Sequence, residues 1–137
     1  MDPDQELYVA LQRAADRLMQ DMQSLLKGHG LSPQQYNVLR ILRGAKGRLN
    51  CTEIANRMIN HDPDMTRLLD RMETKGWIER ARDVNDRRVV LASITGPGLA
   101  LLAELDEPVK ESHKRQFEGL DAEKKVQITE GLKLFLG

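Results

Sequence analysis

The chain has 137 residues, of which 40% are hydrophobic and 31% charged, and this composition is typical of one folded domain and excludes a disordered tail. Its 21 Lys and Arg residues balance 21 Asp and Glu residues, so no overall field marks the chain as a nucleic-acid or membrane binder. The chain has a single cysteine and three scattered histidines, which provide no zinc-ligand spacing. One cysteine suits a reducing cytoplasm. No apolar run approaches the ~20 residues that a membrane span needs.

Apolar residues recur at steps of three and four along residues 5–27, which predicts one long amphipathic helix. They are Leu7, Leu11, Ala14, Leu18, Met22 and Leu25. Gly28 and Gly30 then end the helix. Because this stripe is long for a small monomer, we expect part of it to face another subunit.

Three shorter helices are predicted next, each after a capping residue. Ser32 begins the first, with Gln35 in the capping-box position three residues later. Asn50 and Glu53 repeat that spacing for the second helix. After a turn, Asp62 is the expected cap of the third helix. Pro63 follows it, and proline is favoured at the first position of a helix.

The pattern changes to that of strands after these helices. Residues 77–81 and 89–94 are rich in strand-forming residues, and the polar segment 82–88 joins them. Two such segments predict a β-hairpin with a protruding tip. Two more helices are expected at the end of the chain, one over about 99–117 and one capped by Asp121.

The order helix, short helix, turn, helix and hairpin predicts a winged helix-turn-helix with a two-stranded wing, in a mainly α (α+β) fold. The charge distribution agrees with this interpretation. Residues 31–92 carry twelve basic and eight acidic side chains, a net charge of +4. The flanks, residues 1–30 and 93–137, each carry a net charge of −2.

The third short helix is suited to the major groove of DNA. Its apolar residues fall on one face, whereas Arg67 and Arg71 recur on another, near Thr66. Arginine can bind guanine with two hydrogen bonds, and threonine can contact the thymine methyl group. At the hairpin tip, the adjacent Arg87 and Arg88 can enter a minor groove, where the potential is most negative.

Three segments resemble the MarR family of bacterial regulators: DMTRLLDRMETKGWIER (residues 64–80), NDRR (85–88) and ITGPG (94–98). The family pattern runs roughly TRL(V/L)DRLExKG(L/W)(V/I)xR, then DxR, then LTxxG. Ile94 replaces the usual leucine, which is a mild change. The long first helix and the two closing helices also follow the family's order, so the resemblance covers nearly the whole chain.

The resemblance implies a cytoplasmic bacterial repressor that binds double-stranded DNA as a homodimer on a pseudo-palindromic operator. In this reading residues 1–137 are a single domain, with a DNA-binding lobe over 31–94 and dimerisation helices over 1–30 and 95–137. The family's DNA contacts carry over to Ser32, Gln34, Thr52, Asp64, Met65, Thr66, Arg67, Arg71, Arg87 and Arg88, with Asp86 orienting the wing arginine.

The family also implies a small-molecule effector. Its members often bind aromatic or phenolic anions between the dimer helices and the winged lobe, and binding there weakens DNA affinity. In this chain the candidate lining residues are Arg13, Arg17, His29 and Tyr36. No cofactor or metal is expected.

Two alternatives remain open at this level, and a third is not expected. Cys51, in the first turn of a helix, suits a thiol-based sensor of oxidants, although the family's peroxide sensors carry their reactive cysteine in the first helix. A winged-helix module that binds a protein is the second. An enzyme is the third and is not expected, because no nucleophile, base and orienting group occur together.

Overall fold

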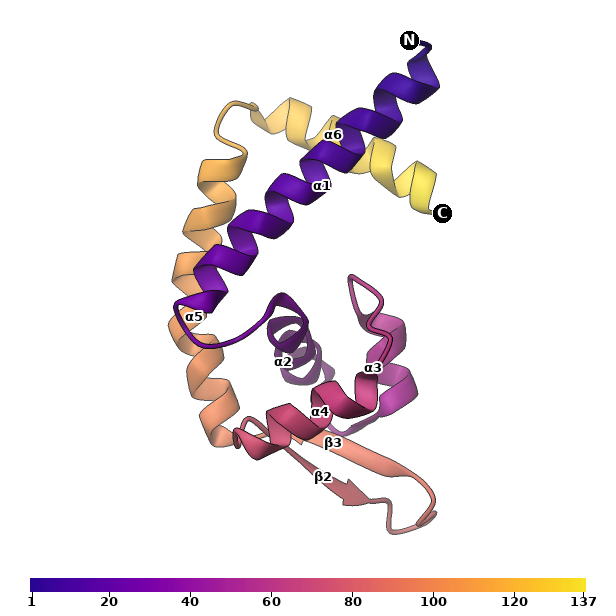
Figure 1. Cartoon of the computed structure of the whole chain (residues 1–137), viewed down its shortest axis with the longest axis vertical. Helices are drawn as coiled ribbons and strands as arrows, with labels where there is room; N and C mark the ends of the chain where they lie inside the picture. The colour runs from indigo at the N-terminus through magenta and orange to yellow at the C-terminus, as the bar shows by residue number, and fades with distance from the viewer.

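Six helices and three short strands make up the chain, and the computed structural model describes all of residues 1–137 (Figure 1). In chain order they are α1 (Pro3–Lys27), α2 (Pro33–Ala45), β1 (Leu49–Asn50), α3 (Cys51–Arg57), α4 (Met65–Thr74), β2 (Ile78–Arg82), β3 (Val90–Ile94), α5 (Gly96–Gln116) and α6 (Ala122–Leu136). The predicted winged helix-turn-helix with flanking helices is therefore confirmed.

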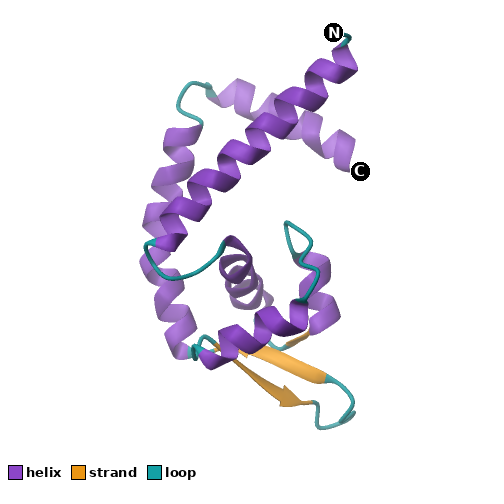
Figure 2. Ribbon diagram, in the orientation of Figure 1, coloured by secondary structure: helices purple, strands orange, loops and turns teal.

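The molecule has a winged lobe and a helical extension. The lobe contains α2, α3, α4 and the sheet, and its hairpin projects from the end farthest from both termini (Figure 1). α1 and the second half of α5 lead away from the lobe, and α6 follows α5 at the end of the extension farthest from the lobe (Figure 2). No helix combines the length and apolar composition that crossing a bilayer requires.

The sheet has three antiparallel strands in the order β1-β3-β2. β2 and β3 form the predicted hairpin, with Ile78 opposite Ile94 and Arg82 opposite Val90. The two-stranded wing is confirmed, and the sheet has a further short strand, β1, which pairs Leu49 with Ala92 of β3. A strand of two residues shows no alternation of polar and apolar side chains, so its pattern could not predict it.

One hydrophobic core joins the winged lobe to both flanking helices. Val38 and Leu39 of α2 are fully buried at its centre. Leu26 of α1 and Leu102 and Leu105 of α5 belong to the same cluster and are also fully buried. The first half of α5 therefore packs as part of the lobe, and the core continues across the boundary at residue 94.

The helix starts depend on side-chain caps. Ser32 with Gln35 and Asn50 with Glu53 form the predicted capping boxes, in which each side chain bonds the other residue's backbone N–H. The predicted cap of α4 was wrong by two residues, because Asp64 rather than Asp62 begins it. The Asp62 carboxylate instead accepts the Asp64 N–H at 2.8 Å, and this local turn holds the preceding loop.

The outer helices present apolar side chains that have no partner within the chain. α6 contains no buried residue, and its Val126 and Phe135 are 60% and 77% exposed. Near the free end of α1, Leu7 and Tyr8 are also largely exposed. Apolar faces of this extent are typical of surfaces that another molecule covers.

Candidate DNA-binding surface

α4 separates an apolar face from a cationic one. Leu68, Leu69 and Met72 are buried against the lobe, whereas Thr66, Arg67 and Arg71 are exposed. Neither Arg67 nor Arg71 takes part in any of the ion pairs of the chain. Two guanidinium groups are therefore available on the outer side of the second helix of the helix-turn-helix.

Two residues expected to contact DNA have other contacts here. The Asp64 carboxylate caps α4 by accepting the Arg67 N–H at 3.0 Å. Met65, the first residue of the helix, is only 9% exposed and belongs to the core. The geometry therefore gives Met65 a packing role and Asp64 a capping role at the start of α4.

Arg80 of β2 connects the sheet to α4. Its backbone N–H and guanidinium donate to Glu73 at 3.1, 3.2 and 2.9 Å, and the guanidinium also donates to Asp70. Partial burial alone would lower the pKa of Arg80, but the hydrogen bonds to both carboxylates outweigh it and the pKa is raised. Sequence reasoning did not single out Arg80, since its partners lie seven and ten residues away.

At the hairpin tip, Asp86 fixes the direction of Arg88. Its carboxylate accepts the Arg88 N–H at 3.1 Å and the guanidinium Nε and Nη2 at 3.1 and 3.2 Å. These bonds lower the pKa of Asp86 below its ordinary value, the side-chain bond contributing most. The Arg88 side chain is nevertheless 91% exposed, so it is oriented and still free to bind.

A second arginine shapes the tip from the opposite strand. The Arg82 guanidinium donates to the carbonyl oxygen of Arg87 at 2.7 Å, and the Asp83 N–H donates to the Val89 carbonyl at 2.8 Å. These bonds close the loop beneath Arg87 and Arg88. Sequence reasoning missed Arg82, because nothing in the local pattern indicates a bond across the hairpin.

The remaining expected contacts lie at helix starts. The Ser32 hydroxyl accepts the Gln35 N–H at 3.2 Å and so caps α2, while Gln34 is half-buried beside the cavity described below. Thr52 is exposed in the first turn of α3. Its neighbour Cys51 is half-buried, packs against the core and is unpaired.

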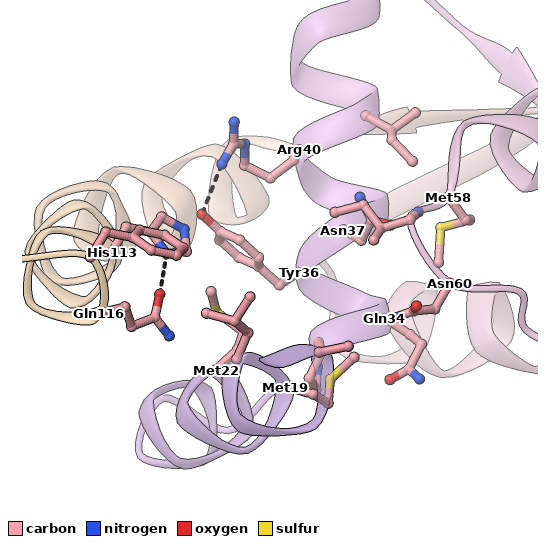
Figure 3. A pocket seen from close by; sticks show the side chains of 16 residues that line it. Met19, Met22, Gln34, Tyr36, Asn37, Arg40, Met58, Asn60, His113 and Gln116 are labelled. Carbon is pink, nitrogen blue, oxygen red and sulfur yellow. Dashed lines mark hydrogen bonds between the residues drawn. The ribbon is translucent and has the colours of Figure 1, made fainter. Parts of the chain in front are cut away.

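A cavity of about 640 Å³ lies between α1, α2, α5 and the turn that follows α3. Nine of its sixteen lining residues are hydrophobic, among them Met19 and Met22. Its polar groups include Tyr36, whose hydroxyl accepts a hydrogen bond from Arg40 at 3.3 Å (Figure 3). His113 and Gln116 of α5, 2.9 Å apart, lie on the facing side (Figure 3).

The four expected pocket residues are not brought together. Only Tyr36 lines the large cavity. Arg13 and Arg17 line a separate hollow of about 300 Å³ between α1 and the end of α5, and His29 is exposed in the turn after α1 and lines neither. The cation in the large cavity is Arg40, which lies one helical turn after Tyr36 and could have been found from that spacing.

Comparison with known proteins agrees with this geometry. The family model "MarR family" matches residues 31–90. A homoprotocatechuate degradative operon repressor of Escherichia coli is 30% identical over 130 residues, which cover 95% of this chain and 87% of the relative.

Two solved structures cover the whole fold. A MarR transcription factor from Planctomyces limnophilus is 36% identical, with a TM-score of 0.76 and 98% of each chain covered. A mutant MarR from Escherichia coli, complexed with operator DNA, is 25% identical, with a TM-score of 0.88 and 100% of each chain covered. These proteins are regulators rather than enzymes, and the chain belongs to the MarR family of DNA-binding transcription regulators.

Proposed function

We propose that the chain is a repressor that binds a pseudo-palindromic operator as a homodimer and is released by a small aromatic ligand. The observation that carries the DNA-binding part is the cationic face of α4 beside an oriented wing arginine, in a chain whose fold matches an operator-bound relative over its full length. Because a bacterial operator lies in the cytoplasm, the proposal also places the protein there.

The proposed DNA contacts divide into two kinds. Thr66, Arg67 and Arg71 of α4 read base edges in the major groove. Arg87 and Arg88 of the wing enter the minor groove, where binding depends on groove width and potential. Thr52, Ser32 and Gln34 approach phosphates from the starts of α3 and α2 and position the lobe without reading sequence.

A second copy of this chain is the proposed partner of the outer helices. The apolar face of α6 and the free end of α1 are exposed over many large side chains, which supports a covered interface. Two winged lobes joined there would read half-sites centred about 34 Å apart, one turn of the duplex.

The proposed effector is a small aromatic anion in the large cavity. The apolar lining suits a ring, and Arg40 with the Tyr36 hydroxyl offers a cation and a hydrogen-bonding group to a carboxylate. With 4-hydroxybenzoate as probe, we expect a raised melting temperature and weaker DNA binding. Arg40→Gln should remove both effects. Arg17→Gln, which changes the separate hollow, should leave both effects unchanged. If both variants respond to the ligand like the wild type, the ligand does not bind in the large cavity.

The direct test measures binding of the purified chain to duplexes from the region upstream of its own gene. We expect saturable binding to one site, with affinity falling about a thousandfold or more between ~50 and ~200 mM salt. Arg67→Ala should relax base specificity, whereas Arg88→Ala should weaken binding to all sequences more evenly. A shallow salt dependence with equal affinity for every duplex would contradict the proposal and favour a protein partner.

A further inference from the structure

We propose that Arg80, on β2, is a positioning residue for DNA binding: it neutralises the carboxylate of Asp70 and so keeps the guanidinium of Arg67 free for the operator. Arg80 would touch no DNA itself. This inference rests on the proposed DNA contacts of α4 and names a residue that controls them.

The contacts assign both acidic side chains of the helix to Arg80. Glu73 accepts the Arg80 backbone N–H through one oxygen and the guanidinium through the other. Asp70, one turn earlier, accepts from the same guanidinium. The Arg80 side chain is only 21% exposed, so its charge is directed to these two carboxylates rather than to solvent.

Arg67 is the natural competitor for Asp70. It lies three residues earlier on the same helix, a spacing at which side chains are neighbours and opposite charges attract. Arg71, adjacent to Asp70 in sequence, points to a different side of the helix. In the structure Asp70 nevertheless pairs with Arg80, and Arg67 has no ion-pair partner.

Freedom of Arg67 matters because a guanidinium recognises guanine through two parallel hydrogen bonds. A guanidinium held by Asp70 has fewer donors left for a base. An unpaired carboxylate at position 70 would also add a negative charge beside the DNA phosphates. Removing Arg80 therefore acts on DNA binding through Asp70, whereas a purely structural role would act through the packing of α4 on the sheet.

The experiment compares Arg80→Met, Asp70→Asn and the double variant, with affinity for the operator and for a scrambled duplex measured beside thermal unfolding. We expect Arg80→Met to lose about tenfold in operator affinity, the size of one base contact, with a smaller loss on the scrambled duplex. Asp70→Asn in the Arg80→Met background should restore most of this loss. Arg43→Met, which breaks another arginine ion pair, is the matched control and should bind like the wild type.

The outcomes separate the two levels of the proposal. If the wild type binds no duplex, the proposed function fails. If the wild type binds but the double variant stays as weak as Arg80→Met, the role is structural and this inference is overturned. If Arg80→Met does not fold, Asp70→Asn alone decides: unchanged affinity agrees with a carboxylate that Arg80 already neutralises, and a tenfold gain contradicts it.

Discussion

Gly98, in the first turn of α5, lies against the backbone carbonyl of Trp77, at the point where the chain leaves α4 for β2. A Cβ at Gly98 would overlap the Trp77 carbonyl oxygen and would stand 2.8 Å from the Ile94 side chain. Thr95 strengthens the same junction, since its N–H bonds the Trp77 carbonyl at 3.1 Å and its hydroxyl bonds the Gly76 carbonyl at 2.6 Å. The absence of a side chain at Gly98 lets α5 approach the backbone between α4 and β2 closely.

Gly98→Ala should therefore destabilise the fold by about 1–3 kcal/mol, because the obstructing atom belongs to the backbone and cannot rotate away. Gly96→Ala, two residues earlier in the same helix turn, is the matched control, since a Cβ there meets nothing within 4 Å. Urea unfolding of both variants measures the difference. Equal midpoints would show that the junction relaxes without cost.

This junction illustrates how far the sequence could predict the structure. The segment ITGPG could be matched to a family pattern, but the reason for its last glycine appears only when Trp77 is placed against it. Helix starts at Ser32 and Asn50 were predictable, because their capping partners are three residues away. The start of α4 was not, since Asp62 and Asp64 are both good caps and only the turn between them decides.

The contacts of the candidate DNA-binding surface also divide into those that the sequence could predict and those that it could not. The exposed arginines of α4 and the bond between Asp86 and Arg88 depend on residues close in sequence. The hydrogen bonds of Arg80 to α4 depend on how β2 packs against that helix. The hydrogen bond of Arg82 across the hairpin depends on the register of β2 with β3. The same limit explains why four plausible pocket residues proved to lie in different places.

The wing should be insensitive to moderate acid. The hydrogen bonds from Arg88 lower the pKa of Asp86. The carboxylate therefore stays ionised as the pH falls through the ordinary range for aspartate. It stops orienting Arg88 only when the pH falls below the lowered pKa. DNA affinity should therefore show no loss from Asp86 between about pH 8 and pH 5. Asp86→Asn should weaken binding at every pH in that range, and less than Arg88→Ala; a variant as tight as the wild type would contradict the orienting role.

The ion pair between Arg43 of α2 and Asp106 of α5 predicts a small pH-dependent term in stability. Both guanidinium Nη atoms lie 3.0 Å from the carboxylate oxygens, and the side-chain hydrogen bond from Arg43 lowers the pKa of Asp106. A lowered pKa means that the pair contributes above the ordinary aspartate range and loses its contribution as the pH falls through the lowered value.

Asp106→Asn should cost less than about 1 kcal/mol at pH 7, because the Arg43 and Asp106 side chains are 34% and 47% exposed and solvent screens the pair. The difference from the wild type should shrink as the pH approaches 3 in urea unfolding series. A gap that stays constant from neutral to acid pH would mean that the variant acts through packing and not through charge.

Ile128→Asp tests the proposed dimer. Ile128 is 49% exposed on the apolar face of α6, a helix with no residue in the core. A buried charge at an apolar interface is strongly unfavourable, so the variant should shift the protein from dimer to monomer in sedimentation equilibrium while the winged lobe stays folded. Asn56→Asp, which adds the same negative charge at an exposed position of α3 in the winged lobe, is the control and should remain dimeric. Operator affinity should fall with dimer content, because each protomer contributes one half-site; a wild type that is monomeric at micromolar concentration would contradict both expectations.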